Sequence, residues 1–146
     1  MGAFTITTSI RRPIDEVFEF MSDGSKTPLW YEAVQSARKT TSGPIGRGFR
    51  YEFTRNLPQG RVTNEVEVSE FEVPRRVTFT SISGPTPFRY RYDLAETHEG
   101  TALTLHGEIS GEGLSGPAAL LAPLASQFFK RGMEKNLAAL TRTLEG

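Results

Sequence analysis

The chain of 146 residues is long enough to bury one sizeable hydrophobic core but not two, and its 37% apolar and 23% charged residues are close to globular averages. Seventeen lysines and arginines balance seventeen aspartates and glutamates. This balance argues against nucleic acid as a partner, because a nucleic-acid surface favours a basic excess. Without cysteine and with only two histidines, the sequence excludes a disulfide framework, a cysteine nucleophile and a thiolate or histidine-rich metal site.

The N-terminal segment, MGAFTITTSIRRP, lacks the apolar run of a signal peptide. No segment reaches the roughly 18 consecutive apolar residues that a membrane span needs. We therefore expect a cytoplasmic protein without integral membrane association, built as one domain over residues 1–146.

The beginning of the chain predicts a strand followed by two short helices. Apolar residues recur at even spacing from Phe4 to Ile10, as in a strand with one buried face. Pro13 suits the first turn of a helix, where its missing N–H costs nothing, and Asp23 marks the end of that helix. The stretch 25–34 predicts the second short helix.

From residue 43 to residue 109 the pattern predicts antiparallel strands, because apolar and polar residues alternate. The alternating segments cover 49–53, 62–73, 77–79, 88–94 and 103–109. The alternation changes phase before Phe71, which predicts a β-bulge near Ser69 or Glu70. Turn residues separate the segments at 58–60, 73–74, 84–85 and 99–100.

The last part of the chain changes to a helical period. Apolar residues from Leu124 to Leu144 predict an amphipathic helix of about 21 residues, or roughly 30 Å, with a shorter helical turn over 116–121 before it. A curved sheet must cover its apolar face, and this helix is the only element long enough to do so. The sequence therefore predicts an α+β fold, in which a curved antiparallel sheet of about seven strands surrounds a long C-terminal helix.

This order of elements resembles the helix-grip fold, and four segments are similar to the polyketide cyclase/dehydrase and lipid-transport superfamily. The superfamily is the START-like group that includes the birch-pollen-allergen proteins. The similar segments are IRRPIDEVFEFM at 10–21, Trp30, GPIGRG at 43–48, and the end of the long helix at 136–145. The resemblance covers essentially the whole chain and implies a hydrophobic cavity. It does not imply one reaction, because members range from ligand carriers to cyclases.

Strand parity divides the sheet residues into an inward and an outward set. The inward set and the helices supply the candidate ligand-binding residues: Trp30, Tyr51, Phe53, Asn64, Val66, Phe79, Ser81, Phe88, Tyr90, Tyr92, Phe128, Phe129 and Met133. Each aromatic member is either cavity wall or closed core, and Trp30 either gates the cavity or braces the second helix. Gly132 leaves space beside the helix residues, which favours a cavity.

The outward set mixes charges of both signs, as on a solvated sheet face. His106 belongs to this set and His98 falls in a turn, so neither is expected to act as a catalytic base. No Ser-His-Asp or paired-carboxylate arrangement falls on the inward set. The sequence therefore predicts no catalytic residue, no metal ligand and no cofactor.

Three functions remain open on these observations. The first is binding or transport of a hydrophobic small molecule, such as a lipid, a polyketide or an isoprenoid-like compound. The second is a polyketide cyclase, aromatase or dehydratase that uses the same cavity, and the third is a protein-interaction module. An inward histidine or carboxylate would favour the enzyme, whereas a sealed core would favour the interaction module.

Overall fold

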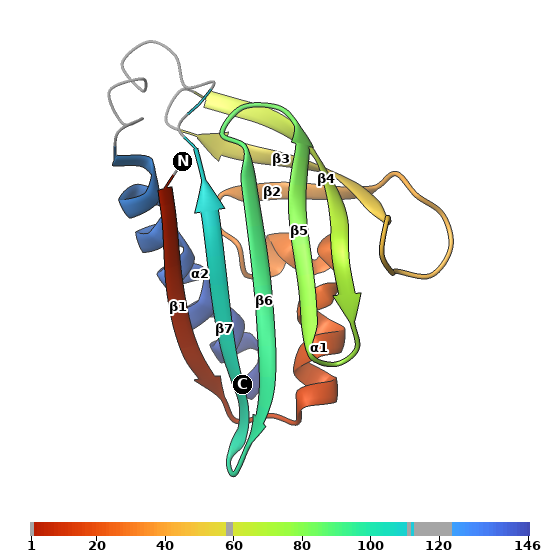
Figure 1. Cartoon of the computed structure of the whole chain (residues 1–146), viewed down its shortest axis with the longest axis vertical. Helices are drawn as coiled ribbons and strands as arrows, with labels where there is room; N and C mark the ends of the chain where they lie inside the picture. Colours follow the sequence, from red (N-terminus) through yellow and green to blue (C-terminus); the bar gives the residue numbers. More distant parts are fainter. Residues whose placement is uncertain (1, 58–59, 111, 113–123) are drawn as a thin grey trace.

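The structure is a computed structural model that describes residues 2–57, 60–110, 112 and 124–146. Its strands are β1 (Gly2–Ile10), β2 (Val34–Lys39), β3 (Arg50–Leu57), β4 (Gly60–Glu72), β5 (Arg76–Ser83), β6 (Phe88–Thr97) and β7 (Gly100–Ile109). Its helices are α1 (Ile14–Ser22), the 3₁₀-helix η1 (Gly24–Leu29) and α2 (Ala125–Glu145). The strands form one sheet in the order β1-β7-β6-β5-β4-β3-β2, with antiparallel neighbours throughout (Figure 1).

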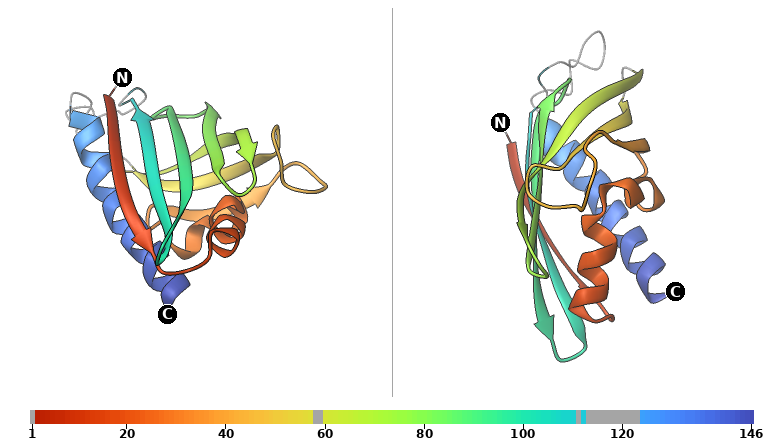
Figure 2. Two further views of the ribbon diagram at one scale, coloured as in Figure 1. Left: turned by 60° about the horizontal axis from the view of Figure 1, so that its bottom comes forward. Right: turned by 90° about the vertical axis from the view of Figure 1, so that its right-hand side faces the viewer.

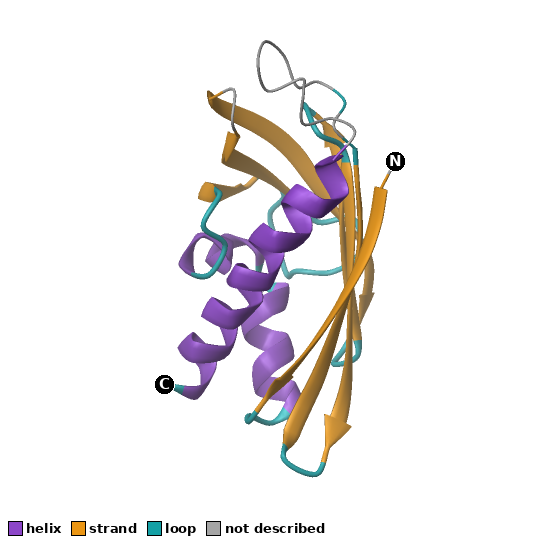
Figure 3. Cartoon of the chain, turned by 90° about the vertical axis from the view of Figure 1, so that its left-hand side faces the viewer, coloured by secondary structure: helices purple, strands orange, loops and turns teal. Residues whose placement is uncertain are grey.

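All three helices lie on one side of the curved sheet, as the edge-on view of Figure 2 shows. Helix α2 runs beside β1 and β7, while α1 contacts β6 and β7 and η1 contacts β2 (Figure 3). The C-terminal end of α2 is tied to the segment between β1 and α1. There the Arg11 backbone N–H donates to Glu145 Oε2 at 2.8 Å, and Arg12 Nε donates to the Leu144 carbonyl at 2.8 Å. This arrangement confirms the expected helix-grip fold.

The two faces of the sheet follow the parity expected from the sequence. Apolar and aromatic side chains of the inward set are buried between the sheet and the helices. The outward charges pair across strands: Arg76 with Asp93 at 2.7 Å, Arg89 with Glu70 at 3.0 Å. His106 Nε2 lies 3.3 Å from Asp93 on the same outer face. These side chains are partly exposed, so the pairs stabilise the fold only weakly.

The β-bulge predicted near Ser69 is present, because the pairing of β4 with β5 shifts between Val68 and Glu70. A second difference of register lies between Glu65 and Val66. Bulges bend a strand and increase its twist, which is what a sheet wrapped around helices needs.

The second short helix ends earlier than the sequence indicated. It is a 3₁₀-helix that stops at Leu29, and Val34 already begins β2 instead of ending the helix. The sequence did not predict strand β2, because only Val34 of its six residues is buried and the strand therefore lacks an alternation of apolar and polar residues. The helical turn expected over 116–121 and the turn residues 58 and 59 lie outside the described residues.

Two aromatic rings approach each other so closely over one sheet position that only glycine fits there without displacing a ring. Gly107 on β7 is paired with Phe4 of β1 on one side and with Tyr90 of β6 on the other. The Phe4 and Tyr90 rings meet edge to face over it, with centroids 6.0 Å apart. A Cβ atom at position 107 would overlap the Phe4 ring.

We therefore expect Gly107→Ala to lower the free energy of unfolding by about 1–3 kcal/mol, because the added methyl group must displace a packed ring. Gly132→Ala is the matched control, since a Cβ at this helical position meets nothing within 4 Å. It should be neutral or raise stability by up to about 1 kcal/mol through helix propensity. Urea unfolding measures both variants; equal stability of Gly107→Ala and the parent chain would contradict the close packing.

All four tyrosines belong to the core: Tyr31, Tyr51, Tyr90 and Tyr92. Burial raises the pKa of each hydroxyl above its ordinary value, for Tyr51 to about 12. Burial has this effect because the charged phenolate loses its hydration inside the protein. For Tyr51 the Gly24 backbone N–H, which donates to the hydroxyl at 3.2 Å, partly offsets the rise.

Tyrosine ionisation is consequently expected to coincide with alkaline unfolding. An unfolded tyrosine titrates near pH 10, so above about pH 10 the unfolded state releases protons that the folded state keeps. The tyrosine contribution to stability is thus fully present below about pH 10 and is lost as the pH rises toward the folded pKa values. Tyrosinate absorbance and circular dichroism, followed together during an alkaline titration, should change in one transition. Tyrosinate absorbance rising near pH 10 in a chain with intact dichroism would contradict this coupling.

Candidate functional site

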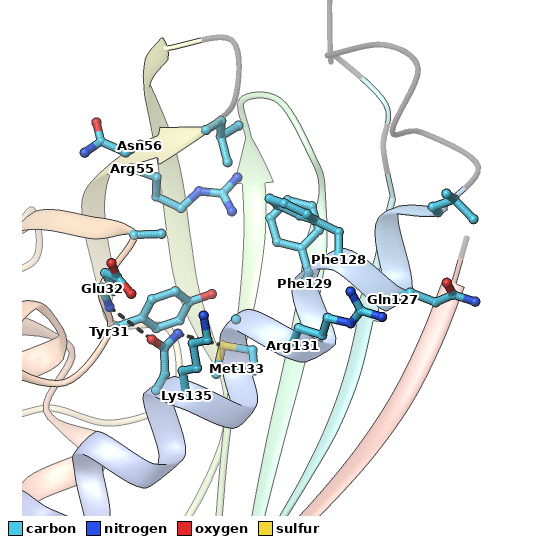
Figure 4. Close-up of a pocket in the computed structure, with 15 residues that line it drawn as sticks. Tyr31, Glu32, Arg55, Asn56, Gln127, Phe128, Phe129, Arg131, Met133 and Lys135 are labelled. Atoms are coloured by element: carbon cyan, nitrogen blue, oxygen red, sulfur yellow. Dashed lines mark hydrogen bonds between the residues drawn. The ribbon is translucent and has the colours of Figure 1, made fainter. Parts of the chain in front are cut away.

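A cavity of about 730 Å³ lies between the first half of α2, the segment that follows η1 and the end of β3 (Figure 4). This volume is within the range of small-molecule sites in proteins. The buried side chains of its floor and wall are Tyr31, Arg55, Leu57, Met133 and Asn136. Exposed side chains around it include Leu124, Phe128, Arg131 and Lys135.

The cavity exists because α2 is anchored mainly by its second half. Leu137 and Leu140 are buried in the core, whereas Phe128 near the start of the helix is 44% exposed. Phe128 and Phe129 meet edge to face with centroids 5.1 Å apart. Gly132 contributes no side chain, and the space where its Cβ would stand is open. The first half of α2 therefore forms one wall without filling the space behind it.

Asn136 connects that wall to the segment after η1. Its Oδ1 accepts a hydrogen bond from the Glu32 backbone N–H at 3.1 Å, and its Nδ2 lies 3.3 Å from Met133 Sδ. Both contacts are drawn in Figure 4. The buried amide thus fixes the distance between α2 and the segment opposite.

The most unusual group in the cavity wall is Arg55 on β3, whose side chain is buried with 2% exposure. Its Nε donates to Asn64 Oδ1 at 2.9 Å, and its Nη2 donates to the Pro85 carbonyl at 3.0 Å and to the Thr86 hydroxyl. The guanidinium carbon lies 5.1 Å from the centroid of the Phe88 ring. In Figure 4 the guanidinium extends from β3 towards Phe128 and Phe129.

Thr86 holds its oxygen near Arg55 from a strained backbone position. Its φ of 49° lies in the left-handed region, which β-branched residues rarely adopt. The residue is fully buried, and its N–H donates to the Glu112 carbonyl at 2.6 Å. Strain of this kind persists where surrounding contacts impose it, and it recurs at binding sites.

The partners of Arg55 are neutral, so its positive charge is not compensated. Arg55 forms no salt bridge in the described part of the chain, and the remaining residues contain no aspartate or glutamate. Burial lowers the pKa of the guanidinium, and the neighbouring Tyr31 and Tyr90 hydroxyls act in the opposite direction. Arginine nevertheless keeps its charge in proteins because its pKa starts so high.

A second, much smaller void of about 20 Å³ lies behind Arg55 and Tyr31, which line both spaces. It has room for about one water molecule. Beside it, Trp30 Nε1 makes no hydrogen bond with any described residue, and the Tyr90 hydroxyl lies next to the Tyr31 hydroxyl. Burial first, and the adjacent Tyr31 hydroxyl next, raise the pKa of Tyr90, so this hydroxyl stays protonated. The region around Arg55 thus contains a buried donor, Trp30 Nε1, for which the described residues supply no acceptor.

The candidate ligand-binding residues divide between the two spaces. Three of them line the large cavity: Phe128, Phe129 and Met133. Six line the small void: Trp30, Phe53, Phe79, Phe88, Tyr90 and Tyr92. Four line neither of these two spaces: Tyr51, Asn64, Val66 and Ser81. Of these four, Asn64 still acts on the site because it accepts the hydrogen bond from Arg55.

Sequence reasoning missed Tyr31, Arg55 and Asn136. Arg55 follows Tyr51 and Phe53 at even spacing, so its inward parity was readable from the sequence. The place of Tyr31 in the cavity wall was not predicted, because the segment 25–34 was expected to be a helix. Asn136 lies one turn beyond Met133 on α2, and a polar residue at that position in the apolar stripe was a signal for a buried contact.

The chemistry of the cavity favours binding over proton transfer. Among the described residues, Glu32 is the only carboxylate that lines the cavity, it is exposed, and no histidine lines the cavity. Among the described residues, no cluster of histidine, aspartate and glutamate has the spacing of a metal site. In the same part of the chain, no helix is both long and apolar enough to cross a bilayer.

Comparison with known proteins agrees with the fold. No curated protein sequence matches the chain. The protein TTHA0849 from Thermus thermophilus superposes with a TM-score of 0.81 at 17% identity, covering 98% of this chain and 97% of that one. A START superfamily protein from Mycobacterium smegmatis gives 0.76 at 13% identity, covering 97% and 98%. Ara h 8.0201 gives 0.73 at 15% identity, covering 98% and 97%.

The family model described as polyketide cyclase / dehydrase and lipid transport matches residues 1–145. That match spans both β1 and the whole of α2, the two elements that bound the helix-grip arrangement. The chain therefore belongs to the polyketide cyclase/dehydrase and lipid transport family.

Proposed function

We propose that the protein binds a hydrophobic small molecule in the cavity between α2 and the end of β3, and that it acts as a carrier. The cavity of about 730 Å³ supports this proposal most directly, because its wall combines apolar side chains with a few fixed polar groups. Removing apolar ligand surface from water supplies the affinity, at about 25 cal/mol per Å² of buried surface. Tyr31 and Arg55 supply polar contacts that orient the ligand.

A cyclase or dehydratase working in the same cavity is the second candidate. One observation favours it: the Tyr31 hydroxyl and the Arg55 guanidinium face the same space, where they could polarise a carbonyl oxygen. Such a reaction also needs a base near the substrate. The raised pKa of Tyr31 makes its phenolate unsuited to that role, and the only carboxylate among the described lining residues is the exposed Glu32. These facts favour the carrier.

The uncharged dye Nile red should bind one site per chain and be displaced by apolar compounds. Gly132→Phe is expected to reduce its affinity at least about tenfold, because the new ring occupies open cavity space. Thr143→Phe adds the same ring to an exposed position near the other end of α2, outside the cavity lining, and should leave the affinity unchanged. Fluorescence titration of the three proteins measures both effects.

Nile red bound equally well by the Gly132→Phe variant and the parent chain would place the dye elsewhere and refute this cavity as the binding site. An unfolded Gly132→Phe variant would be recognised by its dichroism. In that case Gly132→Leu, which adds a smaller side chain at the same position, replaces it in the comparison.

His106→Ala tests the assignment of the outer face. The imidazole contacts Asp93 on the convex side and is partly exposed, so its removal should change stability by no more than about 0.5 kcal/mol. Nile red affinity and any turnover of polyketide-like substrates should stay the same. Loss of turnover in a folded His106→Ala variant would instead favour an enzyme whose chemistry uses the outer face.

A further inference from the structure

We infer that the ligand is an acid, whose carboxylate enters the cavity between Tyr31 and Phe129 and pairs with Arg55. This inference rests on the proposed binding function and specifies the chemistry of the bound molecule. The apolar tail of the acid then lies along Met133 and Phe128, towards the exposed end of the cavity.

The first argument is the cost of a buried charge. A cation removed from water is costly unless an opposite charge or a full set of hydrogen bonds replaces the hydration. Arg55 has neutral partners, and its Nη1 makes no hydrogen bond with the described residues. A carboxylate at Nη1 would supply the missing charge and use the remaining donor in a charge-assisted hydrogen bond.

The second argument is the charge of the lining. Arg55, Arg131 and Lys135 are basic, whereas Glu32 alone is acidic, so the lining carries a net charge of +2 in a chain whose formal net charge is zero. A cavity of one sign raises the local concentration of ligands of the other sign. Two of the cations are exposed at the entrance, and the third is buried at the inner wall.

A purely structural role for Arg55 explains fewer of the contacts around its guanidinium than pairing with a carboxylate does. Holding the Pro85–Thr86 turn requires hydrogen-bond donors but no positive charge, and the Asn64 amide already donates to the Ser83 and Pro85 carbonyls at 3.0 and 2.9 Å. The turn therefore has other support. Trp30 Nε1 adds one buried donor that has no partner among the described residues, which makes this end of the site suited to an acceptor atom.

The experiment compares matched acids and alcohols as competitors of Nile red: dodecanoate against dodecanol, and naphthoate against naphthylmethanol. The two pairs separate an aliphatic acid from an aromatic one, and the acid-to-alcohol ratio within a pair is the quantity measured. For the pair whose tail fits, the acid should bind about tenfold to a hundredfold more tightly, as a charge-assisted hydrogen bond implies.

Arg55→Gln should abolish this acid preference while the alcohol still binds, and Arg55→Lys should retain part of it. Arg38→Gln is the control, because it removes the same charge from an exposed residue paired with Glu52 on the outer face. It should keep the full preference; a loss there equal to that in Arg55→Gln would attribute the effect to net charge and overturn the inference.

A second readout needs no variant. Dodecanoate labelled with ¹³C at the carboxyl carbon reports its own pKa when bound to the parent protein. Pairing with Arg55 lowers the pKa of the bound acid below its free value, whereas an unpaired carboxyl in an apolar cavity has a raised pKa. A raised pKa, or equal affinities for acid and alcohol, would overturn the acid inference. If Nile red and all four competitors fail to bind, the proposed binding function fails as well.

Discussion

The concave face of a seven-stranded sheet is too wide for one helix to cover, and this mismatch determines where the protein has space. Helix α2 lies against β1 and β7, and its apolar stripe from Met133 to Leu140 closes that side of the core. The sheet curves away towards β3 and β2, where η1 contacts β2, while α1 lies against β6 and β7. The first half of α2 faces β3 across a gap, which becomes the cavity. Packing on one side thus leaves room for a ligand on the other.

Arg55 gives that space its chemical character. A purely apolar wall would bind any hydrophobic compound of suitable size, with little orientation. A buried guanidinium, fixed by Asn64 and by the strained turn at Thr86, adds a directional group that is already in place before a ligand arrives. Preorganised groups of this kind reduce the entropy that binding costs. Arg55 and Tyr31 line both the large cavity and the small void, so under the proposed function these two side chains limit how deep a ligand reaches.

The sequence predicted the fold because its strongest signals are periodic. Alternation marked β3 to β7, a phase change marked the bulge at Ser69, and the helical stripe gave α2 to within one residue at each end. The location of the main cavity could not be predicted in this way. It depends on how far α2 stands from β3, which is set by long-range contacts such as that between Asn136 and Glu32. Parity correctly placed Tyr90 and Tyr92 inside, but parity does not distinguish a cavity wall from closed packing.

Strand β2 was not predicted because it is polar, and its polar character also protects the edge of the sheet. It forms one edge of the sheet, opposite the edge strand β1, and its sequence VQSARK buries only Val34 while Arg38 and Lys39 remain exposed. An apolar, regularly alternating strand at this position would have been easy to recognise, and its unpaired backbone groups would also attract strands of other molecules. Charged side chains along the edge oppose such pairing. The β2 edge of the open, curved sheet is therefore disfavoured as a starting point for aggregation.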